Sequence, residues 1–185
     1  MEDNLIIELF FRRSEQALTE VDQKYGHATR KLAYNILHDP QDAEECVNDA
    51  YLGAWNTIPP QKPKPLLTYL LRIVRNVAIK KYHSKTAAKR NSTYDIALTE
   101  LENCFPSGGS VEEAFDAAET ARSINAFLQT LDSENRILFV RRYWQADSIE
   151  DLAKLFQISA HTVSVRLSRT REKLKKHLRK EGISL

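Results

Sequence analysis

The sequence predicts an all-α protein in which two small helical bundles are joined by a flexible linker. Apolar residues recur at helical spacing along most of the 185 residues, without the alternation that marks a strand. The pattern fails in residues 91–110, which are polar and contain a Pro-Ser-Gly-Gly break. Residues 148–176 have the pattern of two helices joined by a tight turn. We therefore expect bundles at residues 1–90 and 111–185, with a helix-turn-helix in the second.

The first bundle is predicted to contain four helices, over residues 5–17, 18–38, 40–57 and 66–85. The third helix begins at Asp39-Pro40, because Asp is a good N-cap and Pro fits the first helical position. The prolines of residues 58–65 exclude a helix there, since proline lacks a donor and fixes φ. The fourth helix carries its cations opposite an apolar face made of Leu67, Leu70, Leu71, Val74, Val77 and Ala78.

In the second bundle, helical spacing resumes over residues 111–130. Asp132 or Ser133 is then placed to cap a helix that runs to Trp144. The helix-turn-helix completes this bundle, and its second helix is rich in Arg and Lys. We expect these helices to pack around one small core.

The helix-turn-helix is predicted in detail by its caps and by its two faces. Ser148 with Asp151 has the form of a capping box, and Ser159 can cap the second helix. The buried stripe of that helix consists of Val163, Leu167, Leu174 and Leu178. The opposite side carries Val165, Ser168, Arg169 and Lys176. A helix with an apolar back and a small, polar and cationic front fits the major groove of DNA.

The charges are unevenly distributed, although the net charge is only +2. Residues 62–90 contain 9 basic and no acidic residues, and residues 160–185 contain 8 basic and 2 acidic ones. Between these blocks, residues 91–118 contain 6 acidic and no basic residues. Either block alone could be a solvated helix face. Two blocks, one of them on a helix-turn-helix, favour two nucleic-acid contacts on one chain.

Several classes of protein are excluded by what the sequence lacks. It has no run of 18 apolar residues for a membrane span, and its N-terminus does not have the pattern of a secretory signal. Cys46 and Cys104 have no spacing suited to zinc or a disulfide framework, which favours a cytoplasmic protein. The five histidines are scattered and no Gly-rich phosphate loop exists. We therefore expect no catalytic residue, metal site, cofactor or small-molecule substrate.

Three stretches of the sequence resemble the signatures of one protein family. They are DAEECVNDAYLGAW at residues 42–55, TYLLRIVRNVAIKKY at 68–82, and SAHTVSVRLSRTREKLKK at 159–176. In this order, with a linker between the second and third, the chain resembles the extracytoplasmic-function sigma factors of the sigma-70 family. The resemblance covers nearly the whole chain. It implies a factor that binds core RNA polymerase and directs promoter-specific initiation of transcription.

The resemblance also implies roles for residues of the first bundle. The polymerase would contact the acidic third helix through Asp42, Glu45, Asn48 and Asp49. The melted −10 promoter element would contact Lys64, Tyr69, Arg72, Arg75, Asn76, Lys80 and Lys81. Asn76 matches an asparagine beside a pocket for an extruded base, and residues 58–65 would form the rest of that pocket. Tyr69 stands where the family commonly has Trp; it can stack on a base or belong to the core.

For the second bundle, the resemblance implies recognition of the −35 element as duplex DNA. The residues expected at that interface are Ser159, His161, Thr162, Ser164, Val165, Arg166, Ser168, Arg169 and Arg171. Of these, Ser164, Val165, Ser168 and Arg169 would face the bases, and the arginines at 166 and 171 would lie near phosphates. Gln157 stands where the family has Gly in the turn. This departure does not exclude the helix-turn-helix fold.

The linker must be long enough for the two bundles to reach two separate promoter elements. Promoter elements one and a half to two DNA turns apart lie roughly 50–70 Å from each other. The acidic residues 91–118 would span about 30 Å as a flexible coil and at most about 90 Å when extended. The family also implies an anti-sigma factor that covers the polymerase-binding surfaces and can hold the otherwise cytoplasmic, nucleoid-associated protein at the membrane. Two alternatives stay open: a helix-turn-helix regulator that binds DNA without polymerase, and RNA binding by the basic helix of the first bundle.

Overall fold

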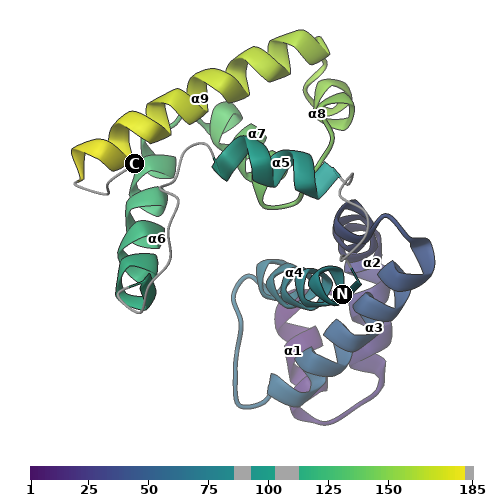
Figure 1. Cartoon of the computed structure of the whole chain (residues 1–185). Helices are drawn as coiled ribbons and strands as arrows, with labels where there is room; N and C mark the ends of the chain where they lie inside the picture. The colour runs from purple at the N-terminus through teal and green to yellow at the C-terminus, as the bar shows by residue number, and fades with distance from the viewer. Residues whose placement is uncertain (86–92, 103–112, 182–185) are drawn as a thin grey trace. The chain divides into compact units, whose positions relative to one another are not determined.

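The computed structural model describes residues 1–85, 93–102 and 113–181, and it separates the chain into two compact units, Met1–Ser92 and Thr93–Leu185 (Figure 1). All elements in the described residues are α-helices, as the sequence predicted. Unit 1 contains α1 (Asp3–Phe11), α2 (Gln16–Leu37), α3 (Pro40–Thr57) and α4 (Leu66–Lys85). Unit 2 contains α5 (Thr93–Glu102), α6 (Glu113–Thr130), α7 (Ser133–Tyr143), α8 (Ile149–Phe156) and α9 (Ala160–Lys180).

Unit 1 is built from three helices, α2, α3 and α4, that pack against one another, with α1 lying on α2. Its core contains fully buried side chains from all four helices, among them Phe10, Val21, Leu32, Ile36, Cys46, Val47, Leu70, Val74 and Ala78. The predicted start of α3 is confirmed: the Asp39 carboxylate accepts a hydrogen bond of 2.8 Å from the Asp42 N–H, and Pro40 is the first helical residue.

The boundary between the first two helices differs from the prediction of one helix over residues 5–17. The helix ends at Phe11 because Arg13 has a φ of 55° and reverses the chain. The Arg13 guanidinium holds this turn on α3, since it donates to the Trp55 carbonyl and lies over the Trp55 ring at 5.4 Å. Ala17 therefore belongs to the start of α2, where it is fully buried.

Unit 2 begins earlier than predicted, because part of the expected linker is a helix. α5 packs on α7, and its residues Tyr94 and Ala97 are buried, with exposed fractions of 6% and 2%. Leu101 also packs against the core of this unit. These three side chains recur at a spacing of three and four residues, a short apolar stripe within a polar segment. Residues 91–92 and 103–110 of the predicted linker lie outside the described residues.

The helix-turn-helix forms as predicted from α8 and α9. The Ser148 hydroxyl accepts from the Asp151 N–H at 3.0 Å, and the Ser159 hydroxyl accepts from the Thr162 N–H at 3.1 Å. Between the helices, Gln157 adopts a left-handed conformation with a φ of 54°, which reverses the chain within one residue. The predicted stripe on α9 is buried against α6, α7 and α8. The opposite face of α9 is thereby turned outward.

Candidate nucleic-acid interfaces

An exposed polar stripe runs along α4 on the side away from the core. Arg72, Asn76 and Lys80 are exposed and follow one another at intervals of four residues, which places them on one helix face. Leu70 and Val74 on the other side are fully buried. The apolar packing of α4 therefore presents three of the predicted −10 residues together on one surface.

A hollow of about 420 Å³ lies beside the start of this stripe. Its lining residues are Gln61, Lys62, Pro63, Lys64, Pro65, Thr68, Tyr69 and Arg72. The Tyr69 hydroxyl donates to Thr57 Oγ1 at 2.7 Å, and the Arg72 guanidinium lies over the Tyr69 ring at 5.5 Å. The aromatic ring in the wall of the hollow is thus fixed at one end by a hydrogen bond and on one face by a cation.

Asn76 is not among the residues that line this hollow, although the sequence predicted a pocket beside it. It lies one helical turn beyond Arg72, about 6 Å further along α4. Gln61 lines the hollow and belongs to residues 58–65, which were predicted to form the pocket, whereas Thr68 also lines it and was not predicted as a site residue. A signal for Thr68 existed in the sequence, because Thr68 precedes Arg72 and Asn76 at the same interval of four residues within the predicted helix.

Lys81 does not share the outward orientation of the stripe. Its ammonium lies 2.6 Å from Glu45 and 3.3 Å from Asp42, and its side chain is 15% exposed. The contacts are ion pairs by distance rather than well-aligned hydrogen bonds, and the Nζ atom itself is shielded from solvent. Burial alone would lower the pKa of Lys81, but the two carboxylates outweigh it and raise the pKa above 10.5. In this conformation Lys81 is a cation held between α3 and α4, and its contact with a phosphate stays a prediction.

The predicted polymerase-binding residues lie on the outer side of α3. Glu45, Asn48 and Asp49 are exposed, whereas Asp42 is half-buried beside Lys81. Leu52, one turn further on, is 58% exposed. Sequence reasoning missed Leu52, although it continues the spacing of residues 45, 48 and 49. The acidic surface therefore contains one large apolar side chain, a common centre for a protein contact.

A second hollow, of about 430 Å³, adjoins this surface between α2 and α3. Leu18, Asp22, Arg30, Glu44, Asn48, Tyr51 and Leu52 line it. Arg30 lies 2.7 Å from Asp22 and 2.8 Å from Glu44, and these partners raise its pKa, the hydrogen bond to Glu44 contributing most. The Tyr51 hydroxyl donates to Asp22 at 3.1 Å and lies 3.1 Å from the buried Thr29 hydroxyl. The hollow thus has fixed charged walls beside the apolar Leu52.

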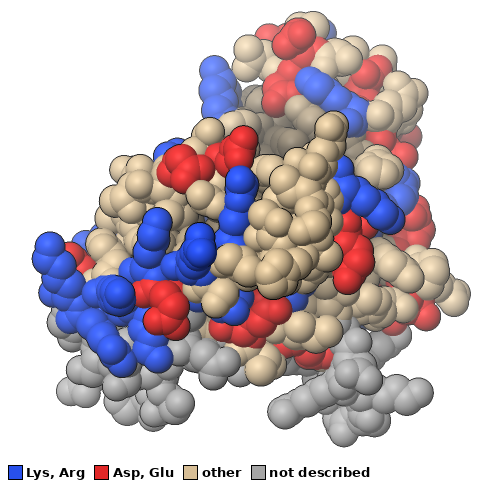
Figure 2. Space-filling view, turned by 90° about the horizontal axis from the view of Figure 1, so that it is seen from above, with Lys and Arg blue, Asp and Glu red and all other residues tan. Residues whose placement is uncertain are grey.

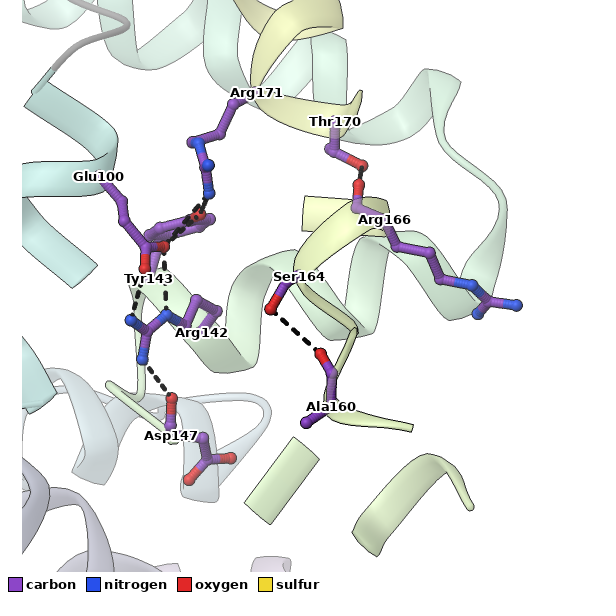
Figure 3. A network of polar contacts seen from close by, with 9 residues as sticks. All are labelled: Glu100, Arg142, Tyr143, Asp147, Ala160, Ser164, Arg166, Thr170 and Arg171. Atoms are coloured by element: carbon purple, nitrogen blue, oxygen red, sulfur yellow. Dashed lines mark hydrogen bonds and ion pairs between the residues drawn. The ribbon is translucent and has the colours of Figure 1, made fainter. Parts of the chain in front are cut away.

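On α9, the predicted DNA-binding residues differ in exposure. The fully exposed ones are Ser159, His161, Ser164, Ser168 and Arg169, and the half-buried ones are Thr162, Val165, Arg166 and Arg171. The Ser164 hydroxyl donates to the Ala160 carbonyl at 3.0 Å (Figure 3). Its proton is therefore engaged with the backbone, and its lone pairs face outward as acceptors. Small side chains here leave room for a base edge to approach the helix.

Two of the predicted arginines have partners within unit 2. Arg166 points away from the core (Figure 3) and pairs with the exposed Glu134 at 3.0 Å. Arg171 is turned inward, where it donates to Glu100 at 3.2 Å and to the Tyr143 hydroxyl at 2.5 Å. In this structure the Arg171 guanidinium faces Glu100 and Tyr143, and its contact with a phosphate stays a prediction. Its guanidinium is occupied because α5 and α7 place a carboxylate and a phenol beside it.

The same carboxylate joins three helices in one polar network (Figure 3). Glu100 of α5 accepts from Arg142 of α7 at 2.8 Å and from the Tyr143 hydroxyl at 3.0 Å. Arg142 is only 2% exposed and also donates to the Asp147 carbonyl at 2.9 Å. Burial, the largest cause, raises the pKa of the Tyr143 phenol, so it remains a neutral donor. The network therefore serves to hold α5 on unit 2.

Further cations extend beyond the predicted residues toward the end of α9. Lys and Arg side chains gather over the C-terminal half of this helix, at the left of Figure 2. The exposed members are Lys173, Lys176, Arg179 and Lys180. The helical spacing had placed Lys176 on the outward face, and the charge count of residues 160–185 was the signal for the other three. Sequence-independent contacts to a phosphate backbone suit such a patch.

Other kinds of site find little support within the described residues. No group of three or more His, Cys, Asp or Glu side chains is close enough there to hold a metal ion. None of the helices described is long and apolar enough to cross a bilayer. The chemical features that do gather on the surface are cations, small hydroxyl side chains and one acidic face.

Known protein families match both units. Residues 22–88 match "Sigma-70 region 2", and residues 121–174 match "Sigma-70, region 4", together about two thirds of the chain. The chain belongs to the sigma-70 family, in its extracytoplasmic-function group. It is therefore an RNA polymerase sigma factor, as the sequence motifs predicted. The first match contains α3, α4 and the proline-rich hollow, and the second contains the helix-turn-helix.

Curated relatives are similar in sequence to this chain along nearly their whole length. The sigma factor is 25% identical to the "RNA polymerase sigma-H factor" of Pseudomonas aeruginosa, with 96% of this chain and 94% of that protein covered. It is 24% identical to the "ECF RNA polymerase sigma factor SigW" of Bacillus subtilis, over 89% and 90%. It is 23% identical to the "ECF RNA polymerase sigma-E factor" of Escherichia coli, over 92% and 91%. The α5 helix and the end of α9 lie outside both family matches.

Proposed function

We propose that this sigma factor uses the surfaces described above in three separate contacts. The outer face of α3 binds core RNA polymerase, the face of α4 with its hollow binds the melted −10 element, and the outward face of α9 binds the −35 duplex. The observation that carries the proposal is the hollow beside the Arg72, Asn76 and Lys80 stripe. A cavity next to a line of cations is what an extruded base and its backbone require.

At the −10 element, Tyr69 is the residue we propose to stack on the extruded base. Its ring is held in place before any DNA binds, so little side-chain entropy is lost on binding. Lys64 and Arg72, on the rim of the hollow, neutralise the flanking phosphates. Asn76 lies one turn away and contacts the neighbouring nucleotide.

At the −35 element, the small residues of α9 would approach the bases and the cations would hold the backbone. Ser164 offers outward acceptor lone pairs, Ser168 a hydroxyl, and Arg169 an exposed guanidinium. Val165 is placed to contact a thymine methyl group. We extend the proposed phosphate contacts to the exposed cations at the end of α9 and leave out Arg171, whose guanidinium is occupied by Glu100.

For the polymerase contact, Glu45, Asn48, Asp49 and Leu52 form the proposed surface. Its mixture of carboxylates and one exposed leucine fits a basic, amphipathic partner helix. Family resemblance adds an anti-sigma factor that covers this surface and keeps the cytoplasmic sigma factor inactive, in some cases at the membrane. The sigma factor itself would carry out no catalysis, since RNA synthesis belongs to the polymerase.

Gel-shift assays on promoter DNA, with and without core polymerase, test the proposal. We expect specific binding to depend on the polymerase, and variants Tyr69→Ala and Arg169→Ala to weaken the −10 and −35 contacts separately. Tight, specific binding by the free chain would instead support an independent helix-turn-helix regulator. Promoter-specific transcripts from a reconstituted reaction would also exclude RNA binding as the main role of α4.

A further inference from the structure

One cation of the −10 helix is paired with two residues of the polymerase-binding helix. Lys81 of α4 lies 2.6 Å from Glu45 and 3.3 Å from Asp42, both on α3. Lys80, the next residue, is exposed and lies on the stripe with Arg72. Two adjacent lysines of the same helix are therefore in different states, one facing solvent and one held by carboxylates.

We propose that Asp42 and Glu45 act as internal counter-ions that withhold Lys81 from DNA until the polymerase engages α3. The inference rests on the proposed function, because it assigns α3 to the polymerase and α4 to the −10 strand. When basic residues of the polymerase pair with Glu45 and its neighbours, the hold on Lys81 weakens. Lys81 then turns outward beside Lys80 and contacts a phosphate of the melted strand.

The geometry allows this exchange. The Glu45 side chain is 65% exposed, so a partner cation can reach it, whereas Asp42 is 16% exposed and stays beside α4. The Glu45 side of the contact lies at the surface, where an ion pair is worth about threefold to fivefold in an equilibrium constant and can be exchanged. The four-carbon stem of lysine is flexible, so the ammonium can change partners without movement of the helix.

The arrangement also has a functional consequence. With Lys81 neutralised by carboxylates, the free factor presents one cation fewer to DNA, and two carboxylates lie near the DNA-binding face. Both features lower its affinity for single-stranded DNA. Binding of the polymerase to Glu45 would free Lys81 and neutralise one of the two carboxylates, so both features are reduced together. The contact therefore couples the two functions of unit 1 and favours DNA binding only within the holoenzyme.

The test compares single-strand binding by the free factor and by the saturated holoenzyme. The probe is a labelled oligonucleotide with the non-template strand of a promoter that the holoenzyme selects from random DNA. Fluorescence anisotropy at several salt concentrations gives both the affinity and its salt slope. Lys81→Gln and the double variant Asp42→Asn/Glu45→Gln test the contact. Lys80→Gln is the matched control for Lys81→Gln, with the same change of charge. Asp49→Asn removes one carboxylate and the double variant removes two, so their effects are compared per carboxylate removed.

We expect Lys81→Gln to weaken binding by the holoenzyme about threefold to fivefold, with a salt slope lower by about 0.7, and to have a smaller effect on binding by the free factor. Lys80→Gln should weaken single-strand binding by the free factor and by the holoenzyme alike. The double variant should strengthen binding by the free factor by a similar ratio, more per carboxylate removed than Asp49→Asn does. Adding Lys81→Gln to the double variant should remove that gain.

Three results would overturn the inference. Equal effects of Lys81→Gln on the free factor and the holoenzyme would show that Lys81 is never withheld, and no effect on either would make it purely structural. An increase with Asp49→Asn as large, per carboxylate removed, as with the double variant would reduce the effect to net charge. Failure of the proposed function is distinguishable, because the wild-type chain would then not bind core polymerase or support transcription at all.

Discussion

Two ion-pair clusters, one in each unit, use similar residues in different surroundings. In unit 1, Lys81 joins Asp42 and Glu45 at a site where Glu45 remains 65% exposed. In unit 2, Glu100 joins Arg171 to an Arg142 side chain that is 2% exposed. Lys81, Asp42, Glu100 and Arg171 are all partly exposed, so the clusters differ in one member each: a partner's cation can reach Glu45, whereas Arg142 is closed to water and to new partners. Burial, and not the type of charge, separates a replaceable contact from a structural one.

The largest effect is expected from the buried cluster. Glu100→Gln should lower the free energy of unfolding of unit 2 by about 2–3 kcal/mol, because it leaves the buried Arg142 without its carboxylate. Urea denaturation followed by Trp144 fluorescence, in a Trp55→Phe background, measures this unit alone. The matched control Glu134→Gln breaks an exposed pair and should cost less than about 0.5 kcal/mol. Equal losses in the two variants would contradict the contrast between buried and exposed pairs.

The next effect concerns the hollow of unit 1. Tyr69→Ala should weaken binding of the −10 single strand by the holoenzyme by about 10-fold to 100-fold, the value of one stacked base. Tyr69→Phe keeps the ring and loses the bond to Thr57, so its effect should be several-fold smaller. Anisotropy titrations of both variants measure the difference. If Tyr69→Ala binds as wild type does, the ring belongs to the core alone.

A smaller, stabilising effect is expected in the turn of unit 2. Gln157 has a φ of 54°, a conformation that favours glycine. Gln157→Gly should raise the free energy of unfolding of this unit by about 0.5–1 kcal/mol, because relief of strain exceeds the added entropy of the unfolded chain. Gln157→Ala, which keeps the strain, serves as the control. A gain with alanine equal to that with glycine would place the cause outside the backbone.

The smallest effect tests an exposed cluster in unit 1 through pH. Burial alone would raise the pKa of Asp3, but hydrogen bonds from Lys24 and Tyr25 outweigh it and lower the pKa below 3.8. This stabilisation is present above pH 3.8 and is lost as the pH falls through the folded pKa. Relative to Asp3→Asn, the wild-type protein should lose less than about 0.5 kcal/mol on acidification. Trp55 fluorescence in a Trp144→Phe background measures it, and an opposite sign would refute the assignment.

Much of the fold follows from local sequence signals. The caps at Asp39, Ser148 and Ser159 depend on one side chain and a backbone N–H three residues later, so they could be located without tertiary information. The same holds for the apolar stripes of α4 and α9, which follow helical spacing. The helix α5 was not predicted, because a segment with two buried residues becomes stable only when another helix covers it.

The sequence by itself determined the helices, their buried faces, the order of the family motifs and the separation of cations into two blocks. Only the tertiary structure decided which of those cations remain outward. Lys81 and Arg171 belong to the same basic blocks as Lys80 and Arg169, but carboxylates from α3 and α5 lie beside the first two. The physical reason is that a side chain's charge is a local property, while its partner comes from residues far away in the chain. The prediction that Asn76 lies beside the pocket failed to locate the hollow for the same reason. The position of the hollow along α4 depends on where the proline-rich segment meets this helix.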